Sequence, residues 1–226
     1  LDIFDAGQPD ANRLRQRASE AEASALSVDG ITNSDGGNAG HGVVDVLIAT
    51  SNGFSAGYQR SSHGVSAVVI AEKNGQMERD YDYSSAVFET DLDGADAVGK
   101  SAAKRTLERL GASKAKTGKF PVIYDRRVAA SLVNTVASAI NGAAVARGTS
   151  FLKEQLGKKI APDGLHFIDD PLRPRGMASR PFDAEGCPVQ TRKMVEDGVL
   201  QGWFLDLSSA AKLGLSSMGN AKRSLG

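Results

Sequence analysis

The sequence predicts an α+β protein in which an antiparallel, hairpin-rich sheet with flanking helices is followed by part of a second, β-rich domain. Two segments with helical spacing, residues 9–26 and 96–111, flank a stretch of β-branched runs. Asn-Gly pairs at 52–53 and 74–75 interrupt these runs, and Asn-Gly between apolar runs is a strong hairpin signal because both residues of a type I′ turn need positive φ. Helices segregated from hairpin-connected strands favour α+β over a parallel sheet.

Composition and charge narrow the class of protein. With 226 residues, 41% apolar and 24% charged, the chain can bury a core as one large or two small domains. Its 27 basic and 27 acidic residues cancel, which gives no electrostatic case for nucleic acid or an anionic membrane as a partner. The single cysteine fits a reducing compartment, and no apolar run is long enough to span a bilayer. We therefore expect a cytoplasmic protein.

The first half of the chain divides into helix, meander and helix. Residues 9–26 are rich in Ala, Glu, Arg and Leu, with apolar residues at helical spacing. Residues 43–88 predict an antiparallel meander, and residues 96–111 return to the helical period. The glycine-rich stretch NSDGGNAGHG, residues 33–42, matches neither the Walker pattern nor G-x-G-x-x-G, and we expect it to be a flexible loop.

A short basic linker, residues 112–119, indicates a domain boundary near Thr117. We expect residues 1–117 to form part of an N-terminal α+β domain and residues 118–226 to form part of a C-terminal β-rich domain. The strand-like run FPVIYD, residues 120–125, would open the second domain.

The second domain is predicted to contain a helix, an irregular segment and a hairpin. Residues 131–151 read as an inner helix that runs into a basic turn, and a basic amphipathic piece follows. Residues 161–188 are rich in Pro and Gly and should be irregular. A hairpin then turns at residues 197–198, before a short helix, LSSAAKLGL. The apolar residues expected in the core of the hairpin are Val195, Val199, Trp203 and Leu205.

The three histidines give no metal-binding pattern, because none has a second ligand-type residue at helical i+4 spacing. His41, in the glycine-rich loop, and His63, beside a turn glycine, are expected to be ordinary surface residues. His166 precedes Asp169 and Asp170, and an imidazole oriented by a carboxylate is a known catalytic arrangement. An aspartate pair before proline is more often a turn with solvated charges, which is the favoured interpretation.

The sequence gives only weak indications of a catalytic serine or cysteine nucleophile. No serine lies in G-x-S-x-G, and those flanking the inner helix are typical of caps and helix packing: Ser131, Ser138 and Ser150. Cys187 would be a nucleophile only if cationic neighbours lowered its pKa, and a lone cysteine before proline is more often a partly buried small residue. A self-sufficient hydrolase built on Cys187, His166 and Asp169 is a minor alternative.

Seven short blocks occur in a characteristic order: ATSNGF, ERDYDYS, TGKFPVIYD, ARGTSF, RPFDAEG, VEDGVLQGWFLD and GNAKR. Together they resemble the PmbA/TldE branch of the TldD/PmbA family, which is long labelled as modulators of DNA gyrase and understood as components of a two-subunit metalloprotease. The resemblance runs from about Asn33 to the end. Because the chain begins with Leu1 and ends in a polar stretch, it looks like a fragment that lacks the family's N- and C-terminal parts.

The resemblance implies a retired metal site on the inner helix. The TldD branch carries H-E-x-x-x-H before the R-G-T-S turn, and aligning on residues 147–150 places its functional positions at Val133, Asn134 and Ser138. Zinc prefers imidazole, thiolate and carboxylate ligands, which these residues do not supply. Without the metal, nothing there lowers the pKa of an attacking water. The face expected to pack beneath this site comprises Leu132, Val136, Ala139, Ile140 and Ala143.

By the same resemblance, this chain binds no metal or other cofactor, and zinc is expected in a TldD-type partner subunit. The heterodimer would enclose a cavity in which extended or unfolded peptides are cut, in peptide maturation or in proteolysis of unstable small proteins. The expected peptide or cavity contacts are Arg147, Thr149, Asp183 and Glu185. The alternative is a non-enzymatic regulatory or binding module of the gyrase-modulator type. In isolation the chain could also form a homodimer through the surface meant for TldD.

Overall fold

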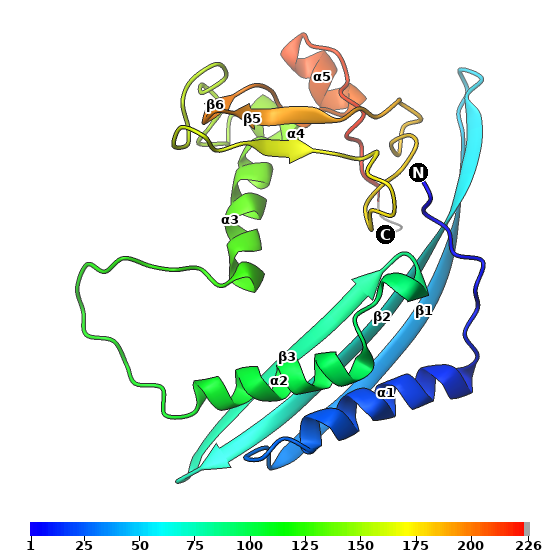
Figure 1. The fold of residues 1–226 in the computed structure, drawn as a ribbon. Helices are drawn as coiled ribbons and strands as arrows, with labels where there is room; N and C mark the ends of the chain where they lie inside the picture. Colours follow the sequence, from blue (N-terminus) through cyan, green and yellow to red (C-terminus); the bar gives the residue numbers. More distant parts are fainter. Residues whose placement is uncertain (224–226) are drawn as a thin grey trace.

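A computed structural model describes residues 1–223, which form two lobes (Figure 1). The last three residues of the expected second domain, 224–226, lie outside the described part. The first lobe holds the long strands, and the second holds the short ones. Residues 110–125 cross between the lobes without helix or strand. The predicted α+β class, with an antiparallel sheet and helices followed by a second small β region, is confirmed.

Three antiparallel strands form the sheet of the first lobe in the order β1-β2-β3. They are β1 (Asn33–Ala49), β2 (Ser55–Lys73) and β3 (Gln76–Ala86). Both predicted hairpins are present, because β2 pairs with each of its neighbours along the chain. At the second turn Asn74 and Gly75 have φ of 53° and 75°, the left-handed pair that a type I′ turn requires.

The glycine-rich stretch that we expected to be a flexible loop is the first part of β1, so that prediction was wrong. Its residues pair in register with β2, apart from an irregularity between Ser34 and Gly36. Glycine serves here as a contact residue, because a Cβ at Gly37 would lie 2.1 Å from the carbonyl oxygen of Ala18. Close packing against a helix therefore overrides the weak strand propensity of glycine.

Two helices cover one face of this sheet (Figure 1). They are α1 (Ala11–Leu26) and α2 (Ala95–Arg109), close to the predicted ranges. Asp10 caps α1 by accepting a hydrogen bond from the backbone N–H of Arg13 at 2.8 Å. The core between helices and sheet consists of small side chains: Ala21, Ala25, Val65, Ala67, Val69, Ala95, Val98, Ala102 and Ala103.

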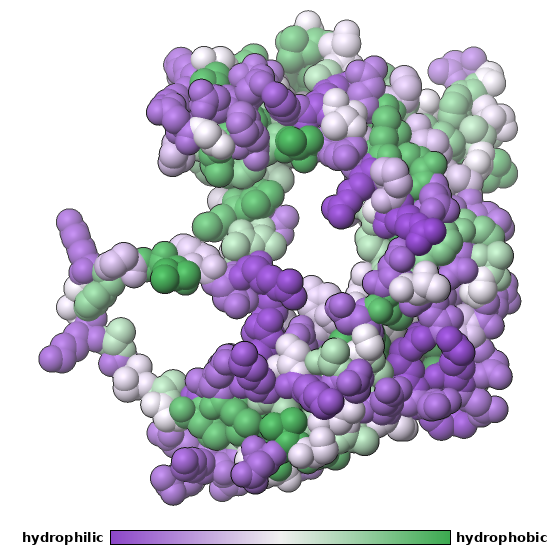
Figure 2. All heavy atoms as spheres, in the orientation of Figure 1, coloured by the Kyte–Doolittle hydropathy of each residue, from purple (hydrophilic) through white to green (hydrophobic). Residues whose placement is uncertain are grey.

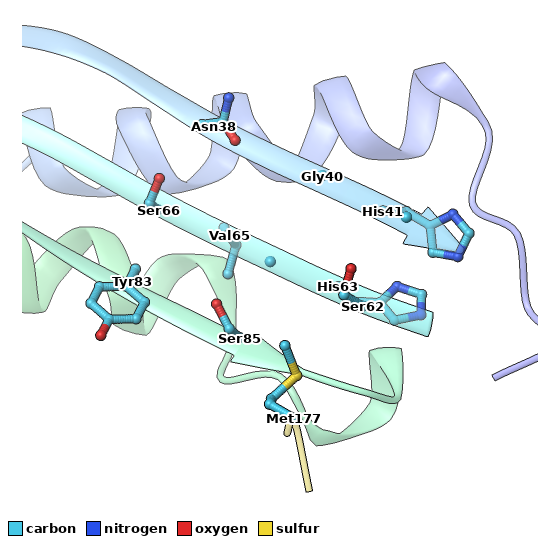
Figure 3. Close-up of a pocket in the computed structure, with 12 residues that line it drawn as sticks. Asn38, Gly40, His41, Ser62, His63, Val65, Ser66, Tyr83, Ser85 and Met177 are labelled. Atoms are coloured by element: carbon cyan, nitrogen blue, oxygen red, sulfur yellow. The ribbon is translucent and has the colours of Figure 1, made fainter. Parts of the chain in front are cut away.

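The opposite face of the sheet, which we call the open face, is covered by no helix among residues 1–223 (Figure 1). Along β2 the odd-numbered residues from Ser61 to Val69 are buried, and the even-numbered residues between them are partly or fully exposed. This alternation is typical of an antiparallel sheet that buries one face. Figure 3 views the open face, with the helices behind the strands. None of the helices within residues 1–223 is long and apolar enough to cross a membrane.

Helix α3 (Arg126–Ala139) connects the lobes through an arginine at its first turn. The guanidinium of Arg127 donates to both carboxylate oxygens of Asp80, at 3.0 and 3.2 Å, and to the carbonyl of Tyr81 at 2.9 Å. Burial by itself raises the pKa of Asp80, but the hydrogen bonds from Arg127 and from the backbone N–H of Tyr81, together with the charges of Arg127 and Arg109, lower that pKa overall. Arg175 makes a second bridge, to Asp2 and Asp91.

The second lobe contains a small sheet of order β4-β5-β6 between short helices. Its elements are α4 (Gly142–Ala146), β4 (Phe167–Asp169), β5 (Arg192–Glu196), β6 (Val199–Leu200) and α5 (Leu207–Leu213). The predicted hairpin turn is confirmed, with Asp197 at φ 48° and Gly198 at φ 77°. Of its expected core residues, Val195, Trp203 and Leu205 are buried, whereas Val199 is half-buried.

Two expectations for the second lobe were wrong. The run FPVIYD forms no strand, and Ile123 within it is 97% exposed because no neighbouring strand lies beside it among the described residues. The expected packing face of α3 is buried only at its C-terminal end. Ala139 and Ile140 are buried, but Leu132 is 47% exposed where the helix leaves the lobe.

His41 and His63 are not ordinary surface residues, so that prediction was also wrong. They pair across β1 and β2, with ring centroids 4.6 Å apart (Figure 3). His63 is 2% exposed because its odd position in β2 turns it to the buried side, and its Nε2 lies 3.3 Å from Oδ2 of Asp5. Burial lowers the pKa of His63, and the neighbouring His41 lowers it further, while Asp5 opposes both effects.

We predict that acid weakens the fold through His63. Its pKa in the folded protein lies below the ordinary value of 6.5, so the unfolded chain takes up the proton more readily. The free energy of unfolding should therefore fall as pH drops from 6.5 through the folded-state pKa. Urea unfolding at a series of pH values measures this. His63→Gln should flatten the dependence in that range, whereas His166→Gln, at an exposed histidine, should retain it.

We predict that Gly99→Ala destabilises the first lobe although alanine is the better helix former. A Cβ at Gly99 in α2 would lie 2.1 Å from the carbonyl oxygen of Ala21 in α1, so the helices must separate. The net loss should be about 1–3 kcal/mol, despite a propensity gain of about 1 kcal/mol. Chemical denaturation measures it. Lys104→Ala, at an exposed position of α2, is the matched control; an equal loss there would contradict the prediction.

Candidate functional site

The face of α3 on which the retired metal site was expected borders a shallow hollow of about 440 Å³. We call it the α3 hollow. Asn134 and Ser138, one helical turn apart, line it together with Thr149 from the turn after α4. The remaining lining residues are Thr135, Ala139, Ala144, Ser150 and Phe151.

Two polar residues fold the chain into this arrangement. Asn141, just after the end of α3, caps α4 by accepting from the backbone N–H groups of Ala143 and Ala144 at 3.1 and 3.3 Å. Ser150 then ties the turn back to α3, because its buried hydroxyl donates to the carbonyl oxygen of Ala139 at 2.5 Å. Gly148, at φ 72°, supplies the left-handed residue between them.

The structure separates Val133 from the other two positions aligned with the family's metal site, Asn134 and Ser138. Val133 lines a different, smaller hollow of about 100 Å³, with Phe167 and Met194 of the small sheet. Positions five residues apart on a helix point about 140° away from each other, so Val133 and Ser138 cannot share a face. Asn134, Ser138 and Thr149 are thus brought together, and Val133 is not.

The α3 hollow does not fit a zinc ion. Among its described lining residues the polar side chains are one amide and four hydroxyls, with no imidazole, thiolate or carboxylate. Zinc sites in proteins are built from those three ligand types. The hollow can offer hydrogen bonds to a neutral ligand or a backbone, but it has no group suited to activate water.

The remaining residues expected to contact a peptide have different environments. Arg147 is exposed at the end of α4. Asp183 is 1% exposed, and its carboxylate accepts from the backbone N–H groups of Glu185, Cys187 and Ala221 at 2.8–2.9 Å. A carboxylate so engaged organises its own loop, because its oxygens already accept hydrogen bonds from the backbone.

Glu185 is also tied to its own chain. One carboxylate oxygen accepts from the backbone N–H of Leu207 at 2.8 Å, at the start of α5, and the other pairs with Arg223. The ligand atoms of Asp183, Glu185 and Cys187 lie within 4.8 Å of one another. However, backbone N–H groups point at the oxygens of Asp183, which suits a turn and not a cation. Cys187 is partly buried, as predicted.

The elements of the alternative hydrolase are not brought together as a catalytic group. His166 is exposed, and its Nδ1 accepts from the backbone N–H of Asp197 at 3.1 Å. Asp169 accepts from Asn220 at 3.0 Å, and Asp170 accepts from Thr191 at 2.6 Å. Within the described residues neither aspartate orients the imidazole. The favoured interpretation of the pair as a turn was only partly right, because Asp169 ends β4 and the turn follows Asp170, at residues 171–172.

Two further hollows lie along the open face of the first lobe. The first, of about 490 Å³, is lined mainly by small polar residues of all three strands; Asn38, Ser66, Tyr83 and Ser85 are among them (Figure 3). The second, of about 440 Å³, is lined by the β1–β2 hairpin together with segments of the second lobe, and it contains several basic side chains. Sequence reasoning missed both, because their residues come from segments far apart in the chain and form no motif.

Comparison with known proteins agrees with the resemblance in the sequence. Residues 4–110 match the model of the PmbA/TldA metallopeptidase central domain, and residues 117–226 match that of the PmbA/TldA metallopeptidase C-terminal domain. The chain is 41% identical over 224 residues to the metalloprotease PmbA of Escherichia coli O157:H7 and 34% identical over 222 residues to the metalloprotease PmbA homolog of Haemophilus influenzae. Each alignment covers 98% of this chain and 49% of the relative.

A crystal structure from Thermotoga maritima MSB8, described as a candidate modulator of a DNA gyrase, has the same fold. It superposes with a TM-score of 0.91 at 24% identity, over 98% of this chain and 52% of that one. The chain therefore spans about half the length of the curated relatives it matches. With two domain models of one family matching successive parts of it, the chain belongs to the PmbA/TldD family, in its PmbA branch.

Proposed function

We propose that this chain acts as the PmbA/TldE-type, non-metal-binding subunit of a two-subunit zinc metalloprotease that cleaves extended or unfolded peptides. The carrying observation is the donor set of the α3 hollow, where Asn134 and Ser138 stand at positions that the TldD branch fills with metal-site residues. In this proposal zinc and the general base belong to a TldD-type partner. The peptides processed are those of peptide maturation and of turnover of unstable small proteins.

A subunit without metal still contributes to such an enzyme. It can wall off a cavity, exclude folded proteins and offer strands to which an extended peptide adds by main-chain hydrogen bonding. Three features support this role: the open face of the sheet, the exposed run FPVIYD, and the opening between the lobes (Figure 2). We further propose a cytoplasmic location and two domains that meet near Thr117.

Reconstitution tests the proposal. The purified chain, a TldD-type subunit and their mixture are each incubated with an unstructured peptide, and cleavage is followed by mass spectrometry with and without chelator. Cleavage that appears in the mixture and is lost with chelator is the expected result. Cleavage by the chain alone that survives chelator would establish the self-sufficient hydrolase instead. Equal cleavage by the partner with and without this chain would favour the regulatory module of the gyrase-modulator type.

We predict that Asn134→Ala combined with Ser138→Ala leaves peptide cleavage by the mixed complex within about twofold of the unaltered complex. The reason is that neither side chain would hold metal or move a proton in the proposed role, so truncation removes no transition-state interaction. Initial rates at subsaturating peptide measure the effect. Replacing the glutamate of the partner's H-E-x-x-x-H motif is the positive control and should abolish cleavage. A hundredfold loss in the double variant would place the chemistry on this chain.

A further inference from the structure

The hollow between the β1–β2 hairpin and the second lobe has two fixed walls, and we call it the basic hollow. Tyr58 and Arg60 of β2 line one wall. The other wall comes from Met177, Arg180 and Phe182 and from residues 221–223. The Tyr58 ring packs edge-on against Phe182 at 5.3 Å, with Phe54 on the same phenyl ring at 5.2 Å. These contacts hold the two walls at a defined separation.

The basic hollow carries an excess of unpaired positive charge. Four basic side chains and one acidic side chain line it: Arg60, Arg180, Lys222, Arg223 and Asp183. Arg223 pairs with Glu185, and the carboxylate of Asp183 already accepts three backbone hydrogen bonds. Within residues 1–223 the other three basic groups form no ion pair, and Nε of Arg180 is buried without a hydrogen-bond partner.

Such groups are suited to an oxyanion. A guanidinium presents several donors in a planar fork that matches a carboxylate, and a charge-assisted bond is stronger than a neutral one. A buried donor without a partner costs free energy, so a ligand that satisfies Nε of Arg180 gains that energy on binding. The apolar side chains of Val46, Ile48 and Phe182 in the same hollow would contact the hydrocarbon part of the ligand.

The neighbouring hollow on the open face indicates what carries the anion. Met177 lines both hollows, so they adjoin. Along β2 the span from Arg60 to Ser66 is about 20 Å, the length of about six residues of extended chain. Except for the two histidines, the lining of the first hollow is uncharged, and three of its residues are glycines that carry no side chain (Figure 3). It therefore suits a peptide main chain and selects no particular side-chain charge.

We propose that the basic hollow binds a carboxylate of an extended peptide that lies along the open face, an inference that rests on the proposed function. Arg60 and Arg180 donate hydrogen bonds to the carboxylate, and Lys222 adds positive charge at the rim of the basic hollow. The carboxylate is either the C-terminus of the peptide or an acidic side chain within it. By holding this group, the chain fixes how far a peptide extends from the basic hollow along the open face.

Binding to the purified chain tests this site. Three versions of one labelled, otherwise uncharged hexapeptide are compared by fluorescence anisotropy: free C-terminal acid, C-terminal amide, and C-terminal amide with an internal glutamate. We expect at least one carboxylate peptide to bind about tenfold or more tightly than the plain amide. Arg60→Gln and Arg180→Gln should each reduce that advantage to near zero without changing the affinity for the plain amide. Preference for the free acid identifies a peptide C-terminus, and preference for the glutamate peptide identifies a side chain.

Matched variants separate the site from general charge effects. Arg60→Lys keeps the charge and should retain part of the advantage. Arg79→Gln, in β3 beside the far end of β2, also removes one positive charge, and this variant should retain the full binding advantage of the carboxylate peptide. Unchanged thermal unfolding of the variants confirms that they fold.

Three outcomes would overturn the proposal. Equal binding of the acid and amide peptides, or an equal loss in Arg79→Gln, rejects the carboxylate site while leaving the peptide-binding face in place. Absence of binding by all three peptides rejects the site and the face together. The cleavage assay with the TldD-type partner reports separately on the subunit role, so failure of this inference and failure of the proposed function are distinguishable.

Discussion

The close contact of α1 and α2 on one side of the β1-β2-β3 sheet is the constraint on which the rest of the structure depends. Gly99 and Ala21 let the helix backbones nearly touch, and Gly37 does the same for β1 against α1. Small Ala and Val side chains fill the space between the helices and the sheet, so this face of the sheet provides the core of the first lobe. Within the described part of the chain no helix packs on the other face, and the second lobe covers only part of it.

Much of this fold was predictable from local signals. The turns at Asn74-Gly75 and Asp197-Gly198 specify two of the hairpins because few residues tolerate their backbone angles, and the two long helices followed from periodicity. The errors came from tertiary effects. Glycines that predict a loop became strand residues where a helix packs on Gly37, and the alternation of β2 carried His63 inward. The run FPVIYD has strand composition, but a strand needs a neighbour, which residues 1–223 do not give it.

Only those residues of the candidate site that lie in or near a contiguous sequence motif could be predicted. The resemblance led to Asn134, Ser138 and Thr149, which the structure brings together, but helical geometry turns Val133 away. Sequence does not reveal which carboxylates accept hydrogen bonds from their own backbone, as that of Asp183 does, so its role in the loop was not foreseen. Arg60 and Arg180 carry no sequence signal, since what distinguishes them is a hollow shared by two lobes and the lack of an ion-pair partner within residues 1–223.

The proposed role is that of a chain that shapes a peptide-processing enzyme without supplying its metal. Zinc affinity tests that claim most directly, because it depends on the donor set of this chain and not on any partner or substrate. The measurement is the zinc content of the purified chain by elemental analysis after equilibration with zinc and removal of the loosely bound ion. The account predicts far less than one zinc per chain. One tightly held zinc per chain, retained in the absence of a partner, would contradict it.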